Sequence, residues 1–204
     1  MKISLPPVTR RTATALLAAL TLSAGIGMAM AAEPVAPKVK FVTSEGDFVV
    51  EVYPDKAPKT VENFLQYVKD KHYNGTIFHR VINNFMVQGG GYDATYAEKK
   101  TRPPVVHEGR EALAKGGAKN VVGTLAMART NEPNSASSQF FINVKDNDFL
   151  NPSTQAPGYT VFGKVVSGMD VVNKIKAVPT GTGGPFPSDV PKTPVVVKSA
   201  TLLN

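Results

Sequence analysis

Residues 78–91 read FHRVINNFMVQGGG and are the most informative stretch of the chain. A cation, two large apolar side chains and an amide lie close together there, as Arg80, Phe85, Met86 and Gln88. The glycines at the end of this stretch are predicted to let the backbone pass close to Arg80 and Gln88, because glycine has no Cβ. No Lys-Ser/Thr pair comes after them, so the pattern is not that of a phosphate-binding loop.

The remaining pattern is mostly that of short strands. Runs rich in β-branched and aromatic residues predict strands at 39–42, 48–53, 77–82, 85–89, 121–128, 139–144, 160–166 and 195–202. Pro58 opens a predicted helix with apolar positions at 61, 64, 65 and 68, and a second helix is predicted over 169–175. The glycine- and proline-rich segment 180–194 is predicted to be a long loop. Such a pattern indicates a mainly β sandwich or barrel, and periodicity does not choose between them.

The first 31 residues are predicted to be a secretory signal peptide. Basic residues at 2, 10 and 11 precede an apolar segment at 13–29, and Ala29-Met30-Ala31 fits a cleavage site. The alternative is a membrane anchor, which the small residues at the end of the segment and the missing basic flank disfavour. We expect cleavage after Ala31, a short linker at 32–38, one domain at 39–204, and a periplasmic location.

The composition limits the classes of function. Without the leader, the net charge falls from +7 to +4, a moderate excess that does not argue for nucleic acid. The chain has no cysteine, which excludes disulfides and thiol catalysis. Its three histidines lie in separate segments without ligand spacing, so neither a metal nor another cofactor is expected. The hydrophobic fraction of 42% is ordinary, and a monomer is expected.

The motif at 78–91, together with SQFFI at 138–142, resembles the signature of the cyclophilins, the peptidyl-prolyl cis/trans isomerases. The resemblance extends from about residue 39 to residue 203. It implies a mainly β fold, a closed eight-stranded antiparallel β-barrel capped by two α-helices. Because side chains fill a barrel of this size, the ligand site is expected on its outer wall. The implied partners are proline-containing, unfolded or partly folded polypeptides, with no nucleic acid and no membrane after signal cleavage.

The resemblance also implies roles for the polar residues. Rotation about an X-Pro bond breaks no covalent bond, so it needs a site that holds the twisted amide better than either planar form. Arg80 is expected to donate a hydrogen bond to the prolyl nitrogen, which becomes an acceptor in the twisted state. Gln88 is expected to bond the substrate backbone. Gln139 is expected to support the arginine, and His79 is expected to pack beside it.

The apolar residues are implied to form the proline pocket and its rim. Four side chains are expected to hold the pyrrolidine ring: Phe85, Met86, Phe141 and Leu150. Phe149 and Tyr159 are expected at the rim. Ala128 begins a segment expected to grip the substrate before the proline, where the backbone of Arg129 pairs with the preceding residue.

Two rim positions differ from many eukaryotic cyclophilins, which carry Trp at the position of Phe149 and His at that of Tyr159. Since phenylalanine lacks the indole N–H donor, cyclosporin-type cyclic peptides are expected to bind weakly. These differences, with segment 180–194, resemble exported bacterial cyclophilins. The alternative function is a holdase or proline-peptide binding module without turnover. The presence of Arg80 favours the enzyme, because binding alone could use the apolar pocket and Gln88.

Overall fold

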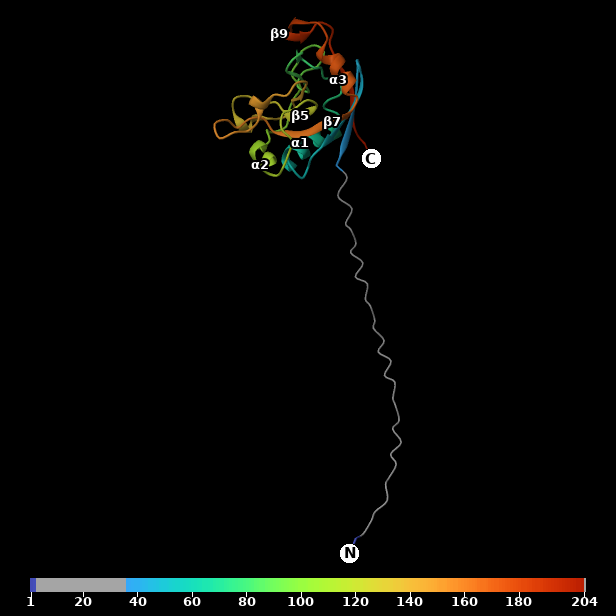
Figure 1. The fold of residues 1–204 in the computed structure, drawn as a ribbon. Helices are drawn as coiled ribbons and strands as arrows, with labels where there is room; N and C mark the ends of the chain where they lie inside the picture. The colour runs from blue at the N-terminus through green and yellow to red at the C-terminus, as the bar shows by residue number, and fades with distance from the viewer. Residues whose placement is uncertain (3–35, 204) are drawn as a thin grey trace. The chain divides into compact units, whose positions relative to one another are not determined.

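The computed structural model describes residues 1–2 and 36–203 (Figure 1). The predicted signal segment at 13–29, the cleavage site after Ala31 and residues 32–35 of the predicted linker lie outside the described residues. None of the helices in the described part has the length and apolar character needed to cross a membrane.

Eight antiparallel strands form one curled sheet in the order β10-β1-β2-β7-β5-β6-β4-β3. Their bounds are β1 (Lys38–Thr43), β2 (Gly46–Val52), β3 (Arg80–Ile82), β4 (Met86–Gly89), β5 (Thr124–Met127), β6 (Phe140–Asn143), β7 (Val161–Ser167) and β10 (Val197–Leu203). Each strand overlaps a range predicted from the sequence. The fold is therefore mainly β, as predicted.

The expected closed barrel is wrong, because the sheet has two edges, β10 and β3. Between these edges lies one isolated bridge, which pairs Ile77 with Val196. The backbone N–H of Phe78 also donates to the carbonyl of Val195 at 3.0 Å. The strand β3 has only 3 residues, too few for a continuous ladder, so the sheet is a half-barrel whose edges meet through scattered hydrogen bonds.

The structure has three helices in the described residues where two were expected: α1 (Pro58–Lys69), α2 (Gly109–Ala114) and α3 (Met169–Lys176). The unpredicted helix α2 has 6 residues, too short to show a helical period in the sequence.

The prediction of a long loop at 180–194 is wrong. This segment contains an antiparallel ribbon of β8 (Thr180–Gly183) and β9 (Phe186–Pro191), joined by a turn in which Gly184 has φ of +51°. Two 3₁₀ turns complete the fold: η1 (Pro133–Ser135) and η2 (Asp148–Leu150).

The first turn of α1 is capped from a distant part of the chain. Pro58 occupies the start of the helix, and no side chain of the preceding residue caps it. Instead, the backbone N–H groups of Lys59 and Thr60 donate to the carboxylate of Glu108 at 3.1 and 2.7 Å. The hydroxyl of Thr60 donates to the same carboxylate at 2.7 Å. Glu108 is only 4% exposed, so its carboxylate has little contact with water. The three donors and the positive end of the helix dipole stabilise it instead.

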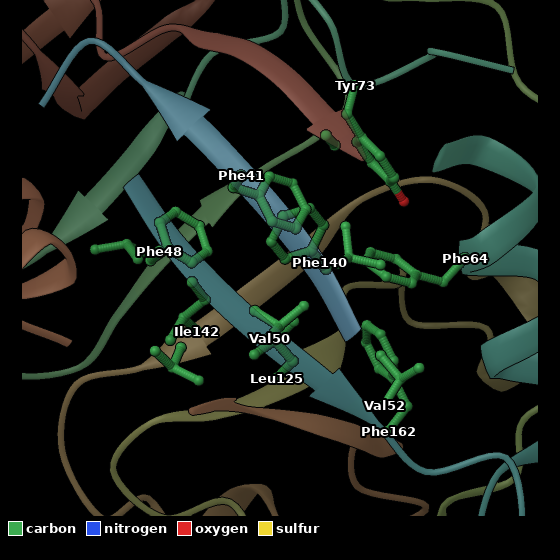
Figure 2. Packing of buried hydrophobic residues seen from close by; sticks show 14 of the residues in the cluster. Phe41, Phe48, Val50, Val52, Phe64, Tyr73, Leu125, Phe140, Ile142 and Phe162 are labelled. Carbon is green, nitrogen blue, oxygen red and sulfur yellow. The ribbon is translucent and has the colours of Figure 1, made fainter. Parts of the chain in front are cut away.

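Aromatic rings fill the inner face of the sheet (Figure 2). The ring of Phe41 stacks on Phe48 with centroids 5.0 Å apart, and Phe140 meets Phe64 of α1 edge to face at 5.9 Å. All four rings are at most 1% exposed, and burying each stabilises the fold by about 1.5–3 kcal/mol. Strand alternation then forces the neighbours of these residues onto the outer face, where the predicted site lies.

Candidate active site

A row of cross-strand partners carries predicted site residues across the outer face of the sheet. Arg80 on β3 pairs with Gln88 on β4, and Gln88 pairs with Phe141 on β6. Phe141 in turn pairs with Ala126 on β5. Because opposed residues on neighbouring strands point to the same face, these four side chains share the outer face. The adjacent row packs into the core: Val81, Val87, Ile142 and Leu125.

A pocket of about 270 Å³ opens over the outer row. Eleven of the twelve residues predicted for the site line it, and only Phe149 does not. Tyr92 and Phe186 also line it, and the sequence analysis missed both. Tyr92 directly follows the three glycines of the motif, which could have pointed to it. Phe186 lies in the segment predicted to be a loop, where nothing in the sequence placed it near Arg80.

The floor of this central pocket is a second hydrophobic cluster, separate from the core. Its buried members are Met86, Ala126, Phe141, Leu150 and Val161. Tyr159 meets the ring of Phe141 edge to face at 5.4 Å. Phe149 lies at the rim, 72% exposed, where its ring stacks on Phe85 at 5.6 Å. The arrangement presents an apolar depression bounded by aromatic rings.

A chain of buried asparagines fixes two walls of the central pocket. The side-chain amide of Asn147 donates to the carbonyl of Phe85 at 2.9 Å, and that of Asn120 donates to the carbonyl of Leu150 at 3.2 Å. Asn143 joins them, since it donates to Asn120 at 3.1 Å and accepts from Asn147 at 2.7 Å. All three amides are at most 2% exposed. This network couples the position of Phe85 to that of Leu150.

The polar side of the pocket is built from two glutamines and a glycine. The Nε2 of Gln88 donates to the Oε1 of Gln139 at 3.0 Å. A Cβ on Gly91 would lie 2.6 Å from the side chain of Gln139, so a larger residue there would displace Gln139. The close approach predicted beside Arg80 and Gln88 is instead made to Gln139 by Gly91, whereas Gly89 approaches Phe78 and Gly90 approaches Tyr73. The guanidinium of Arg80 is exposed at the edge of the pocket and forms no ion pair with any described residue.

His79 is a packed, neutral ring next to Arg80. It is 3% exposed, and burial lowers its pKa to about 4. The carbonyl of Ile77 opposes this shift, whereas the positive charge of Arg80 adds to it. The Nδ1 atom of His79 is buried without a hydrogen-bond partner in the described part of the chain. The ring is therefore uncharged at pH 7, and proton transfer is not needed for rotation about an amide bond.

The side chain of Arg129 has a structural use that the sequence did not reveal. Its Nε and one terminal nitrogen donate to the carbonyl of Gly158 at 3.1 and 2.9 Å. The guanidinium also lies over the ring of Tyr159, 4.7 Å from its centre. These contacts join the rim segment at Ala128 to the segment that comes after Leu150. The backbone N–H and carbonyl of Arg129 form no hydrogen bond with other described residues.

The comparison with known families agrees with this geometry. Residues 38–202 match the model of the cyclophilin type peptidyl-prolyl cis-trans isomerases. The chain belongs to this family. The cyclophilin named peptidyl-prolyl cis-trans isomerase B of Escherichia coli (strain K12) is 54% identical over 167 residues, which are 80% of this chain and 98% of that protein. A peptidyl-prolyl cis-trans isomerase of Acinetobacter baylyi is 53% identical over 164 residues, covering 80% and 84%.

Solved cyclophilins share the fold. A cyclophilin type isomerase of Cryptosporidium parvum matches with a TM-score of 0.65 at 25% identity, covering 83% of this chain and 98% of that chain. A second structure of that protein was determined in the presence of the dipeptide Ala-Pro, and it matches with a TM-score of 0.64 at 25% identity, covering 82% and 99%. This cyclophilin is accordingly a peptidyl-prolyl cis-trans isomerase, as the sequence predicted.

Two other features of this cyclophilin lie apart from the central pocket. A hollow of about 660 Å³ runs between α1 and β10, with Leu65 and Leu202 among its aliphatic walls. None of the predicted site residues in the described part of the chain lines it. Within the described residues, no group of three His, Asp or Glu side chains could hold a metal ion. The central pocket thus remains the place where the predicted site residues meet.

Proposed function

We propose that this isomerase accelerates rotation about X-Pro bonds without covalent chemistry, with Arg80 as hydrogen-bond donor to the prolyl nitrogen of the twisted amide. The observation that carries this proposal is the outer row, which sets the exposed cation of Arg80 two strands from Phe141 in the apolar floor. A proline ring on that floor would bring its nitrogen toward the guanidinium.

Estimates of free energy separate the role of the apolar floor of the pocket from that of the Arg80 cation. Burying the three ring methylenes of proline is worth about 2.4 kcal/mol, but the cis, trans and twisted forms all gain it. The floor therefore contributes affinity and leaves the barrier of about 18–20 kcal/mol unchanged. A charge-assisted hydrogen bond made only in the twisted state is worth roughly 1.5–3 kcal/mol, which is about 10- to 150-fold in rate.

The rest of the acceleration is assigned to positioning and to exclusion of water. Shortening isomerisation from tens of seconds to about a millisecond requires on the order of 5.5–7 kcal/mol, more than Arg80 alone supplies. The unpaired backbone of Arg129 offers an N–H and a carbonyl to the residue before the proline, and Gln88 offers its side-chain amide. Holding one flank in place leaves rotation of the other flank as the reaction coordinate.

The proposed substrates are proline-containing segments of unfolded or partly folded proteins outside the cytoplasm. The structure of the Cryptosporidium relative in the presence of the dipeptide Ala-Pro supports a proline peptide as ligand.

The sequence of residues 1–31 supports export, with cleavage after Ala31, a linker to residue 38 and the domain from residue 39. Cell fractionation of the full chain, followed by N-terminal sequencing of the recovered protein, tests location and cleavage site together. Recovery of uncleaved chain from the cytoplasm would contradict export.

The test of the mechanism measures cis/trans exchange of a short Ala-Pro peptide by NMR. Arg80→Ala should lower the exchange rate constant at least about 10-fold with peptide affinity little changed. Arg80→Lys is the matched control, since it keeps the charge but loses the planar fork of donors. If the wild type binds peptide but does not accelerate exchange, the protein is a proline-recognition module or holdase and the proposal fails.

A further inference from the structure

An aromatic subsite lies at the β3 edge of the central pocket, in a region where the sequence predicted only a loop. The ring of Phe186 on β9 packs against His79 at 5.3 Å and meets Tyr92 edge to face at 5.0 Å. Tyr92 also meets His79 at 4.8 Å, so the three rings touch one another. All three line the same pocket as Arg80. We call these three residues the outer subsite.

The ribbon that carries Phe186 is anchored, so the outer subsite exists before any substrate binds. Val190 of β9 is 1% exposed and ties the ribbon to the body of the protein. Tyr96 packs so closely on the turn that a Cβ on Gly183 would lie 2.7 Å from its hydroxyl. The backbone N–H of Lys192 donates to the carbonyl of Pro179 at 2.9 Å and closes the base of the ribbon. Because the subsite is already ordered, a ligand that binds there pays little conformational entropy for ordering it.

The position of the outer subsite indicates which part of a substrate reaches it, and this step rests on the proposed function. The proposed function places the residue before the proline at Arg129, which comes directly after β5. The outer subsite lies beside β3, which the strand order β5-β6-β4-β3 places three strands from β5. Residues after the proline therefore run toward Phe186. Phe141 and Arg80 are two strand spacings apart, about 10 Å, which an extended peptide covers in about three residues.

We propose that the outer subsite binds an apolar side chain, with aromatic rings preferred, at the second or third residue after the substrate proline. Its walls are rings, and edge-to-face contacts favour another ring over a small or charged side chain. Half-exposed Tyr92 and Phe186 offer the open surface, whereas His79 lies buried beneath them. The subsite thus selects among X-Pro sequences by the residues on the C-terminal side of the proline.

The test compares four peptides in the NMR exchange assay: Ala-Ala-Ala-Pro-Ala-Phe-Ala, Ala-Ala-Ala-Pro-Ala-Ala-Phe, Ala-Phe-Ala-Pro-Ala-Ala-Ala and the all-alanine parent. For the wild type, at least one of the two peptides with phenylalanine after the proline should show kcat/KM about fivefold above the parent. Phe186→Ala should remove that preference, and Phe186→Leu should keep part of it. Pro187→Ala is the matched control on the same ribbon, because its exposed side chain points away from the subsite.

Three results would overturn the proposal. One is a wild type that treats all four peptides alike. Another is a Phe186→Ala variant that slows all four by the same factor, which would leave the ring a purely structural role. The third is a Phe186-dependent preference for the peptide with phenylalanine before the proline. The parent peptide with Arg80→Ala reports separately on the donor mechanism, so failure of the subsite and failure of the mechanism are distinguishable.

Discussion

The side chain of Phe149, at the rim of the pocket, offers no hydrogen-bond donor to a ligand. It is 72% exposed and stacks on Phe85, so its outer edge faces solvent without a donor. Cyclosporin should therefore bind this protein weakly, with a dissociation constant in the micromolar range or higher. Phe149→Trp adds an indole N–H and should tighten binding by up to about 10-fold, the worth of one neutral hydrogen bond. Isothermal titration with both proteins checks this, and submicromolar binding by the wild type would refute it.

The neutral ring of His79 leads to a prediction about the pH dependence of catalysis. Burial holds its pKa at about 4, so the residue beside Arg80 has the same charge at pH 6 and at pH 8. We expect kcat/KM for an Ala-Pro peptide to differ by less than about twofold between these two pH values. NMR exchange measurements at both pH values check it. A rate that follows a single titration near pH 6.5 would contradict this prediction.

Among the elements, the first turn of α1 depends on a carboxylate 48 residues away from Thr60. Glu108→Ala removes the acceptor of three hydrogen bonds and leaves two backbone N–H groups at the helix start without a partner. We expect a loss of about 2–4 kcal/mol in the free energy of unfolding. Urea denaturation of the wild type, Glu108→Ala and Glu108→Gln checks this. The amide of Gln keeps one acceptor, so this variant should lose less, and equal losses would contradict the capping role.

The asparagine network supports a second prediction at this scale. Asn143→Ala removes one hydrogen-bond partner each from Asn120 and Asn147, which hold the carbonyls of Leu150 and Phe85. Because the floor of the pocket contributes affinity, KM should rise about 10-fold while kcat falls less. The free energy of unfolding should also drop by about 1–3 kcal/mol. A drop in stability with unchanged KM would mean that the network does not position the pocket.

Local signals predicted some elements and could not predict others. Pro58 and the apolar stripe after it were enough for α1, since both act within one helix. The ribbon of β8 and β9 was missed because its glycines and prolines have the composition of a loop, whereas tertiary contacts such as those of Tyr96 and Val190 hold it in place. The Asn network was missed because its hydrogen-bond partners are distant in the sequence. Motif residues place the cation and the floor, whereas the supports around them come from tertiary contacts.

At the scale of the whole molecule, the histidines make stability depend on pH. Burial lowers the pKa of His79 to about 4 and also lowers the pKa of His72 and His107. Each folded-state pKa lies below the unfolded value near 6.5, so this stability is fully present above pH 6.5 and is lost as the pH falls toward 4. His79 alone should cost about 2 kcal/mol between pH 7 and pH 5. Urea denaturation at both pH values checks this against His79→Gln, whose stability should fall less. An equal fall in the two proteins would exclude His79 as a cause.

The open sheet also shows what the family signature could not specify. The motif implied a closed barrel. Closure depends on how many backbone hydrogen bonds join the segment at Ile77 to the segment at Val196, and no local pattern encodes that number. The outer face was predictable nonetheless, because strand alternation around Arg80 and Gln88 fixes it whether or not the sheet closes.

The pairing of β1 with β10 has a consequence for the order in which the protein can be made. Lys38 pairs with Leu203, so the first strand of the sheet waits for residues that a ribosome adds 165 positions later. Until then β1 has only β2 beside it, and its other edge offers unpaired backbone groups to any passing strand. A nascent or truncated chain without residues 197–203 therefore carries an incomplete sheet. The sheet of this isomerase is therefore complete only after synthesis has passed β10.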